Sequence, residues 1–105
     1  MKRTKSYHES LMRALKNPRE AAEYLNAALE QEDREMFLTA LRNIAEAHGG
    51  MARLSRLSKL NRANLYKMMS KHGHPEIQSI HRVLEAFGLK LAVEVQSRGK
   101  MLRAA

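Results

Sequence analysis

Apolar residues recur at helical spacing along most of the chain, which predicts an all-α fold with one exception near the C-terminus. A short stripe over residues 7–16 comes first and predicts an N-terminal helix. The following stripes predict five further helices, over about residues 18–31, 34–47, 51–58, 62–70 and 75–87. Together these segments predict a small helical bundle.

Polar residues mark the starts of three predicted helices. Asn17 stands before Pro18, and this pair is typical of a helix start because the asparagine side chain accepts a backbone N–H while proline needs no partner. Asp33 precedes the next apolar stripe in the same way, and Asn61 precedes the helix over residues 62–70. Two consecutive glycines end the helix over residues 34–47, since glycine readily adopts the left-handed conformation there.

The exception is a segment whose period changes from that of a helix to that of a strand. Leu89, Leu91, Val93 and Val95 alternate with polar or small residues, which predicts one short, half-buried C-terminal β-strand. One strand leaves its backbone groups unpaired, so we expect it to pair with the same strand of a second copy in a homodimer. The alternative is an extended tail packed on its own chain.

The length and pattern divide the chain into three parts. A chain of 105 residues suits one domain. We expect a basic N-terminal segment over residues 1–16, a helical domain over residues 17–96, and a mobile basic tail over residues 97–105.

The net charge of +8 is unevenly distributed. Residues 17–50 hold seven acidic and three basic residues, whereas residues 51–71 hold six basic residues and no acidic one. A short stretch of one sign produces a local field that attracts a polyanion such as DNA. A solvated helix face is the alternative for such a stretch, and it applies to Arg53 and Arg56 in particular.

Composition excludes several classes of protein. The chain has no cysteine, which excludes disulfides, thiolate metal sites and a cysteine nucleophile. Without an apolar run of about 20 residues or a secretory leader, a cytoplasmic protein with no membrane partner is expected. We find no catalytic constellation and no phosphate-binding glycine loop, so we expect no enzyme activity and no cofactor. His72, His74 and His81 are too weak a signal to predict a metal site.

Residues 51–70 carry the most specific pattern in the chain, that of a helix-turn-helix. Such a unit needs two short helices that touch through a few small or apolar residues across a tight turn. Leu54 and Ser58 would face inward from the first helix, and Leu60 would fill the turn. Leu65 and Met68 would face inward from the second helix, which leaves its outer face basic and polar.

The outer face of the second helix supplies the candidate DNA contacts. Arginine bonds guanine bidentately in the major groove, so we assign base contacts to Arg62 and Lys67. Ala63 suits a thymine methyl group, and Tyr66 suits a base or phosphate unless it is half buried. Phosphate contacts, which position a protein without reading sequence, are assigned to Arg53, Asn61, Ser70 and Lys71.

This stretch resembles the helix-turn-helix of the Cro/repressor class, and a longer run resembles a more specific family. Over roughly residues 20–95 the chain is similar to addiction-module antidote proteins, which are antitoxins of the HigA-like kind. The resemblance rests on the segments YLNAAL (24–29), FLTAL (37–41), GMARLS (50–55), LYK (65–67) and VLEAFGL (83–89). Two positions depart from the usual helix-turn-helix pattern: Lys59 stands where the turn usually has glycine, and Ser55 stands where the first helix often has alanine.

The resemblance implies two activities. An antitoxin of this kind binds and blocks a small, basic, mRNA-cleaving toxin of the RelE or HigB type, and it binds its own operator to repress the operon. The acidic segment over residues 17–50 suits a basic toxin, because opposite potentials steer association. The alternatives are a Cro-like transcriptional regulator with no toxin partner, and a protein-interaction module whose basic helix meets an acidic partner.

Overall fold

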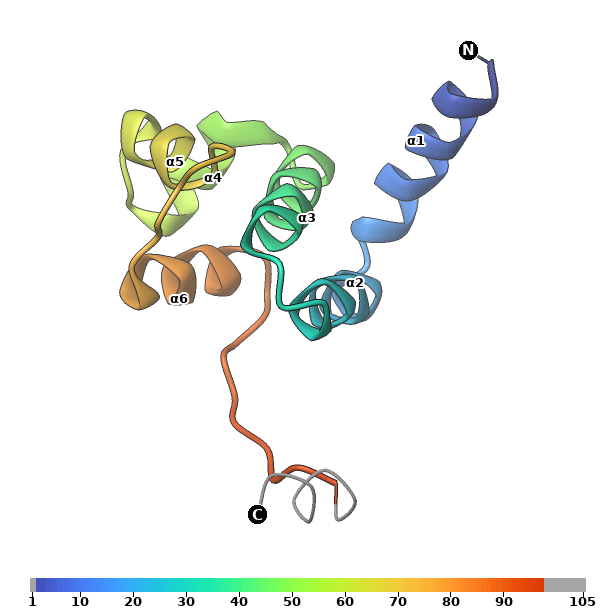
Figure 1. The fold of residues 1–105 in the computed structure, drawn as a ribbon. Helices are drawn as coiled ribbons and strands as arrows, with labels where there is room; N and C mark the ends of the chain where they lie inside the picture. The colour runs from blue at the N-terminus through green and yellow to red at the C-terminus, as the bar shows by residue number, and fades with distance from the viewer. Residues whose placement is uncertain (1, 98–105) are drawn as a thin grey trace.

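The computed structural model describes the backbone of residues 2–97 and the side chains of residues 5–97. This part of the chain forms six α-helices and no β-strand, as Figure 1 shows. The helices are α1 (Lys2–Leu15), α2 (Pro18–Glu30), α3 (Arg34–Ala47), α4 (Gly50–Ser58), α5 (Arg62–Met68) and α6 (Ile77–Ala86). The expected all-α class is therefore correct for these residues.

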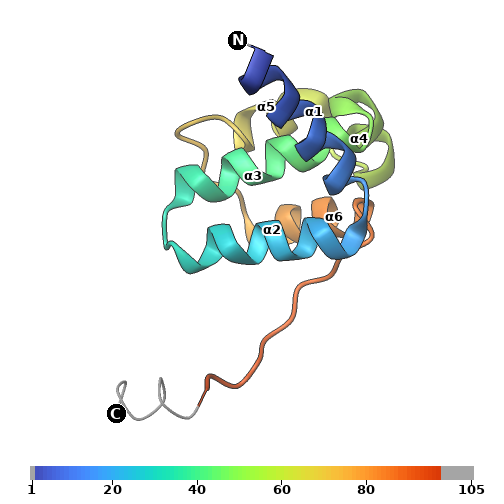
Figure 2. The same cartoon turned by 90° about the vertical axis from the view of Figure 1, so that its right-hand side faces the viewer.

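α3 lies at the centre of the fold, and its apolar stripe supplies much of the core. Leu38, Leu41 and Ile44 are fully buried on it. α2 lies alongside α3 (Figure 2), and its own buried residues are Ala21, Leu25 and Ala28. Burying a leucine or isoleucine side chain contributes roughly 1.5–3 kcal/mol, so this stripe stabilises the position of every helix packed on it.

The predicted caps of α2 and α3 are confirmed. The side-chain oxygen of Asn17 accepts the backbone N–H of Arg19 at 2.8 Å. Asp33 accepts the N–H of Met36 at 3.2 Å and so begins α3. Gly49 and Gly50 both have positive φ where α3 ends and α4 begins, as the predicted helix stop requires.

α1 is longer than the helix predicted over residues 7–16, and its last turn joins the core. Leu15 is buried, and its carbonyl oxygen accepts a hydrogen bond from Nε2 of His48 at 2.8 Å. Further along α1, Nε2 of His8 lies 2.7 Å from a carboxylate oxygen of Glu46. The first half of α1 projects away from the other helices in Figure 1.

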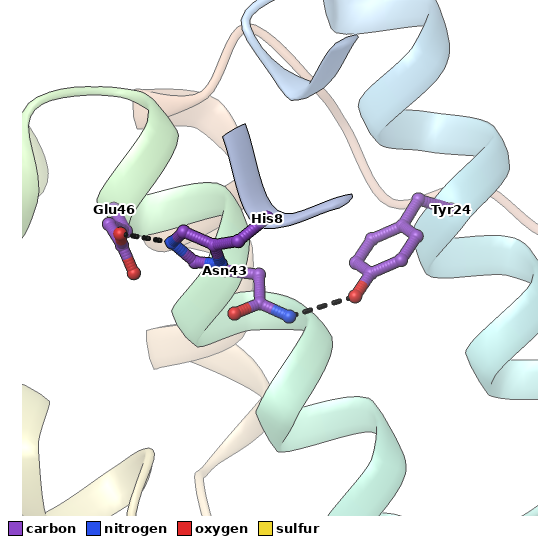
Figure 3. A network of polar contacts seen from close by, with 4 residues as sticks. All are labelled: His8, Tyr24, Asn43 and Glu46. Carbon is purple, nitrogen blue, oxygen red and sulfur yellow. Dashed lines mark hydrogen bonds and ion pairs between the residues drawn. The ribbon is translucent and has the colours of Figure 1, made fainter. Parts of the chain in front are cut away.

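Polar contacts on the surface join the first three helices. The side-chain N–H of Asn43 on α3 donates to the hydroxyl of Tyr24 on α2 at 2.8 Å, and Figure 3 shows this bond beside the contact between His8 and Glu46. One face of α3 therefore holds both α1 and α2.

α6 closes the bundle on the side of α2 and α4. Val83 and Leu84 are buried, and Phe87 lies against the ring of His48 with centroids 5.3 Å apart. The helix begins at Ile77, and Glu76 at its N-cap makes no side-chain capping bond. Ile77 is 72% exposed, so the apolar pattern of α6 extends beyond the core.

The predicted C-terminal strand is wrong for the single chain. Residues 89–97 form no strand, and residues 90–97 are exposed along an extended path that leads away from the helices (Figures 1 and 2). The reason is physical: a strand is defined by backbone hydrogen bonds to a neighbour, and the described part of this chain offers no second strand. The predicted mobile tail falls almost entirely outside the described residues.

Candidate nucleic-acid interface

α4 and α5 pack against each other through the residues that the sequence pattern selects. Leu54 and Ser58 are buried on α4, and Leu65 and Met68 are buried on α5. Leu60 is half buried in the three-residue connection over residues 59–61. The inward faces of both helices are therefore buried, and this determines which faces of α4 and α5 are exposed to solvent.

The turn between the two helices is closed by local hydrogen bonds. Lys59 has φ 63°, the left-handed conformation that favours glycine, and its N–H donates to the carbonyl of Ser55 at 2.9 Å. The hydroxyl of Ser55 donates to the carbonyl of Leu60 at 2.5 Å, and the N–H of Leu60 donates to the hydroxyl of Ser58 at 3.3 Å. The serine that replaces the usual alanine therefore satisfies a turn carbonyl.

Both ends of α5 are held by side chains. Asn61 accepts the backbone N–H of Asn64 at 2.7 Å, which confirms it as the predicted N-cap. At the other end, the guanidinium of Arg42 on α3 donates to the carbonyl of Met69 and, at 2.9 Å, to the hydroxyl of Thr39. Because α5 has seven residues, these two anchors do much to set its orientation.

The loop after α5 turns back closely over the end of the helix. The N–H of Gly73 donates to the carbonyl of Ser70 at 2.9 Å. A Cβ atom at Gly73 would overlap the backbone oxygen of Met68, so glycine is required there. The hydroxyl of Ser70 donates to the carbonyl of Lys67 at 2.8 Å, and its oxygen remains able to accept a further hydrogen bond.

The structure places all eight predicted DNA-contact residues on the surface. On α5 these are Arg62, Ala63, Tyr66 and Lys67, and around it are Arg53, Asn61, Ser70 and Lys71. Tyr66 is 54% exposed, so about half of its surface is covered and the rest is available to a base or phosphate. Within residues 5–97, a basic side chain meets a carboxylate in two places, His8 with Glu46 and His81 with Glu85, and neither contact involves this face.

Helical geometry explains how the predicted contact residues of α5 share one face of that helix. With Leu65 and Met68 directed into the core, a rotation of about 100° per residue directs Ala63, Tyr66 and Lys67 outward. Arg62 and Asn64 flank this row on its two sides. Two cations and no carboxylate lie on this helix face, which favours phosphate, while Glu76 after the helix lines one pocket with Asn64 and Lys67.

Sequence reasoning missed one residue on this face. Asn64 is exposed beside Lys67, and its side-chain amide has the donor and acceptor that can pair with adenine. The signal was present: Asn64 precedes the inward-facing Leu65 on a helix whose register the apolar residues already define.

The opposite sign of charge gathers where α2 meets α3. The connection exposes four carboxylates around one cation, Arg34, and we call the four the acidic corner: Glu30, Glu32, Asp33 and Glu35. Lys71 and His72 line the same pocket as three of them. Leu29 and Met36 are exposed beside them, so the corner combines negative charge with apolar surface. Such a combination is suited to a basic protein partner.

Other kinds of site find little support in the described residues. Residues 5–97 bring together no group of three His, Cys, Asp or Glu side chains that could bind a metal ion. In the described helices, no segment has both the length and the apolar character needed to cross a membrane.

These observations define the class of protein: a small all-helical protein with a cationic, exposed helix pair and an acidic corner. Comparison with known proteins gives the family. Residues 6–95 match the family model described as "Probable addiction module antidote protein", and the chain belongs to that family. An antidote of an addiction module implies a toxin as its partner.

One relative supports the same placement. The chain is 36% identical over 75 residues to an uncharacterized protein of Haemophilus influenzae, and the match covers 71% of this chain and 75% of the relative. No solved structure matches the chain.

Proposed function

We propose that this antidote protein neutralises a small, basic, mRNA-cleaving toxin of the RelE or HigB type and represses its own operon through α4 and α5. In this proposal, α4 and α5 form a helix-turn-helix of the Cro/repressor class, with α5 in the major groove of the operator. The protein acts in the cytoplasm, where its DNA and its toxin are both present.

The observation that carries the DNA half is the exposed outer face of α5. Arg62 and Lys67 lie on this face, while Leu65 and Met68 fix the helix from the other side. A helix that reads bases must present donors on a surface held rigidly from behind. Arg62, Ala63, Tyr66 and Lys67 face base edges, and Arg53, Asn61, Ser70 and Lys71 bind phosphates.

The toxin half rests on family membership and on charge. The acidic corner presents four carboxylates, and a basic toxin would be steered to it by opposite potential. The corner and the outer face of α5 use separate residues, but the two surfaces adjoin, since Lys71 lines one pocket with Glu32, Asp33 and Glu35.

Operator binding by this class of unit requires two copies. Helix-turn-helix dimers place their reading helices in two half-sites about one turn of DNA apart. The extended residues 89–95 are the segment through which we propose that two copies associate.

The test is Arg62→Ala, with Arg19→Ala as a matched control on the exposed surface of α2. We expect Arg62→Ala to lower operator affinity by roughly 1–3 kcal/mol and to reduce the preference over random duplex DNA by the same amount. Toxin neutralisation, measured by co-expression with the toxin of the same operon, should be unchanged in both variants. Unchanged operator affinity in Arg62→Ala would contradict the assignment of α5 as the reading helix.

A further inference from the structure

The C-terminal segment runs beside an apolar groove that the described chain does not fill. The groove lies between α2, α6 and residues 88–92, and its walls include Leu25, Leu29, Phe37, Ile80, Leu89 and Leu91. Beyond it, Val93 is 100% exposed and Val95 is 85% exposed. A row of exposed valines next to an open apolar groove is costly in water, so this surface is suited to a partner.

The backbone of the same segment is also without partners. The N–H of Leu89 donates to the carbonyl of Leu84 at 2.8 Å. From residue 90 to residue 97, the described chain makes no backbone hydrogen bond to this segment. An extended stretch with open donors and acceptors is a template for strand pairing.

We propose that two copies of the chain pair residues 89–95 as antiparallel strands. The two-fold axis between the strands passes midway between the two copies of Ala92, which therefore lie opposite each other. This inference deepens the homodimer of the proposed function by assigning its register. In this register Lys90 lies opposite Glu94 of the partner subunit, and the partner's Lys90 lies opposite Glu94. Opposite charges directly across an antiparallel pair stabilise it, and here the two-fold axis makes two such pairs.

The same register joins the apolar surfaces. Leu91 lies opposite the partner's Val93, and Leu89 lies opposite the partner's Val95. Directly opposed side chains have Cβ atoms about 4.5–5.5 Å apart. Because Leu89 and Leu91 line the groove, the partner's Val93 and Val95 would lie at the edge of the groove and would be shielded from water.

Other registers lose these pairs. Moving the axis to Val93 places Lys90 opposite the partner's Gln96, and moving it to Leu91 places Lys90 opposite the partner's Ala92. An axis through Lys90 or Glu94 opposes like charges. If the pairing shifts by a single residue, so that Leu91 lies opposite the partner's Ala92, the apolar faces of the two strands lie on opposite sides of the sheet. Parallel pairing sets each charge beside its own copy.

The proposed register predicts how exchanging the charges of Lys90 and Glu94 changes the dimer dissociation constant. Lys90→Glu opposes two glutamates at each pair and Glu94→Lys opposes two lysines, so each variant should raise the dimer dissociation constant about tenfold. The double variant Lys90→Glu/Glu94→Lys restores opposite charges and should return the constant to within about threefold of the original. Sedimentation equilibrium measures all four proteins. Single variants without effect, or a double variant without rescue, would overturn the register.

A crosslink tests the position of the axis directly. The chain contains no cysteine, so Ala92→Cys introduces one thiol per protomer. Opposed residues in an antiparallel pair have Cα atoms about 4.5–5.5 Å apart, within the range of a disulfide. Ala92→Cys should therefore form a covalent dimer on mild oxidation, whereas Gln96→Cys should not, because its copies lie about eight residues apart along the strands.

These experiments are independent of the proposed function. Neither needs DNA or toxin, so a failed charge swap with intact operator binding would overturn the register alone. Equal crosslinking of both cysteine variants, or a monomeric parent protein, would also overturn it. Loss of operator binding in a protein that still dimerises in this register would instead contradict the proposed function.

Discussion

The helix pairs α2–α3 and α4–α5 fold by the same rules and present opposite surfaces. Each pair has a side-chain cap at the start of its second helix, Asp33 for α3 and Asn61 for α5. Each buries an apolar stripe and closes its connection with a residue of positive φ, Glu32 in one and Lys59 in the other. Outside, the first pair carries the acidic corner, and the second carries a cationic face without carboxylates.

The comparison teaches that fold and function use different positions of the same helices. Buried residues and caps decide where each helix lies, and they are alike in both pairs. The outward residues contribute little to stability, since exposed charges have small effects on folding. In the proposed function they determine which partner each pair attracts, so charge changes on either pair should mainly alter the binding of that partner.

The largest expected effect is that of salt on the two kinds of binding. A dimer whose cationic phosphate contacts are Arg53 and Lys71 of each copy should lose roughly a hundredfold in DNA affinity between 50 mM and 200 mM salt, because bound counterions are released. The proposed toxin binding at the acidic corner should fall much less, because charge in protein–protein association mainly sets the association rate and the specificity. Titrations of DNA and toxin at matched salt concentrations measure both. Equal salt dependence would break the contrast between the two pairs.

Much of this contrast could be predicted from the sequence. The apolar stripes and the caps Asn17, Asp33 and Asn61 predict the helices, and Leu65 with Met68 predicts which face of α5 stays exposed. Local patterns suffice here because helices satisfy their own backbone hydrogen bonds.

Features that depend on distant residues could not be predicted in this way. His8 meets Glu46, and Arg42 meets the carbonyl of Met69, across gaps of 38 and 27 residues. No periodicity signals such contacts. The prediction of a strand over residues 89–95 was wrong for a related reason. A strand forms only beside a neighbouring strand, and the described chain has none.

A second effect, smaller than that of salt, tests the acidic corner. Glu30→Lys/Glu32→Lys should slow toxin association about tenfold at low salt, because the corner would repel a basic protein. Operator affinity should not fall, because the added positive charge lies near Lys71 and favours DNA. Asp33 is left intact since it caps α3. Stopped-flow association rates measure the effect, and Glu9→Lys/Glu23→Lys, which reverses two exposed charges outside the corner, is the matched control. Slowing of the same size in that control would show that net charge acts without any local site.

Removing one N-cap asparagine from each helix pair tests the comparison through changes of about 1 kcal/mol in the free energy of unfolding. Asn17→Ala and Asn61→Ala each remove a side-chain acceptor at a helix start, so each should lower the free energy of unfolding by about 1 kcal/mol. Asn61→Ala alone should also weaken operator binding, because that residue holds the start of α5 and is one of the proposed phosphate contacts. Chemical denaturation and DNA titration measure the two effects. Equal loss of DNA affinity in Asn17→Ala would mean that cap removal acts through general destabilisation.

The smallest effect concerns Lys59, whose φ of 63° strains a residue that has a Cβ atom. The left-handed conformation costs a residue other than glycine roughly 1–2 kcal/mol, and glycine gives back part of this through the greater entropy of its unfolded chain. Lys59→Gly should therefore raise the free energy of unfolding by roughly 0.5–1 kcal/mol. Lys59→Ala removes the same charge but keeps the strain, so its stability should stay near that of the parent. If both variants gained equally, the gain would come from relieved charge repulsion on α4–α5, and the two helix pairs would differ in stability as well as in surface.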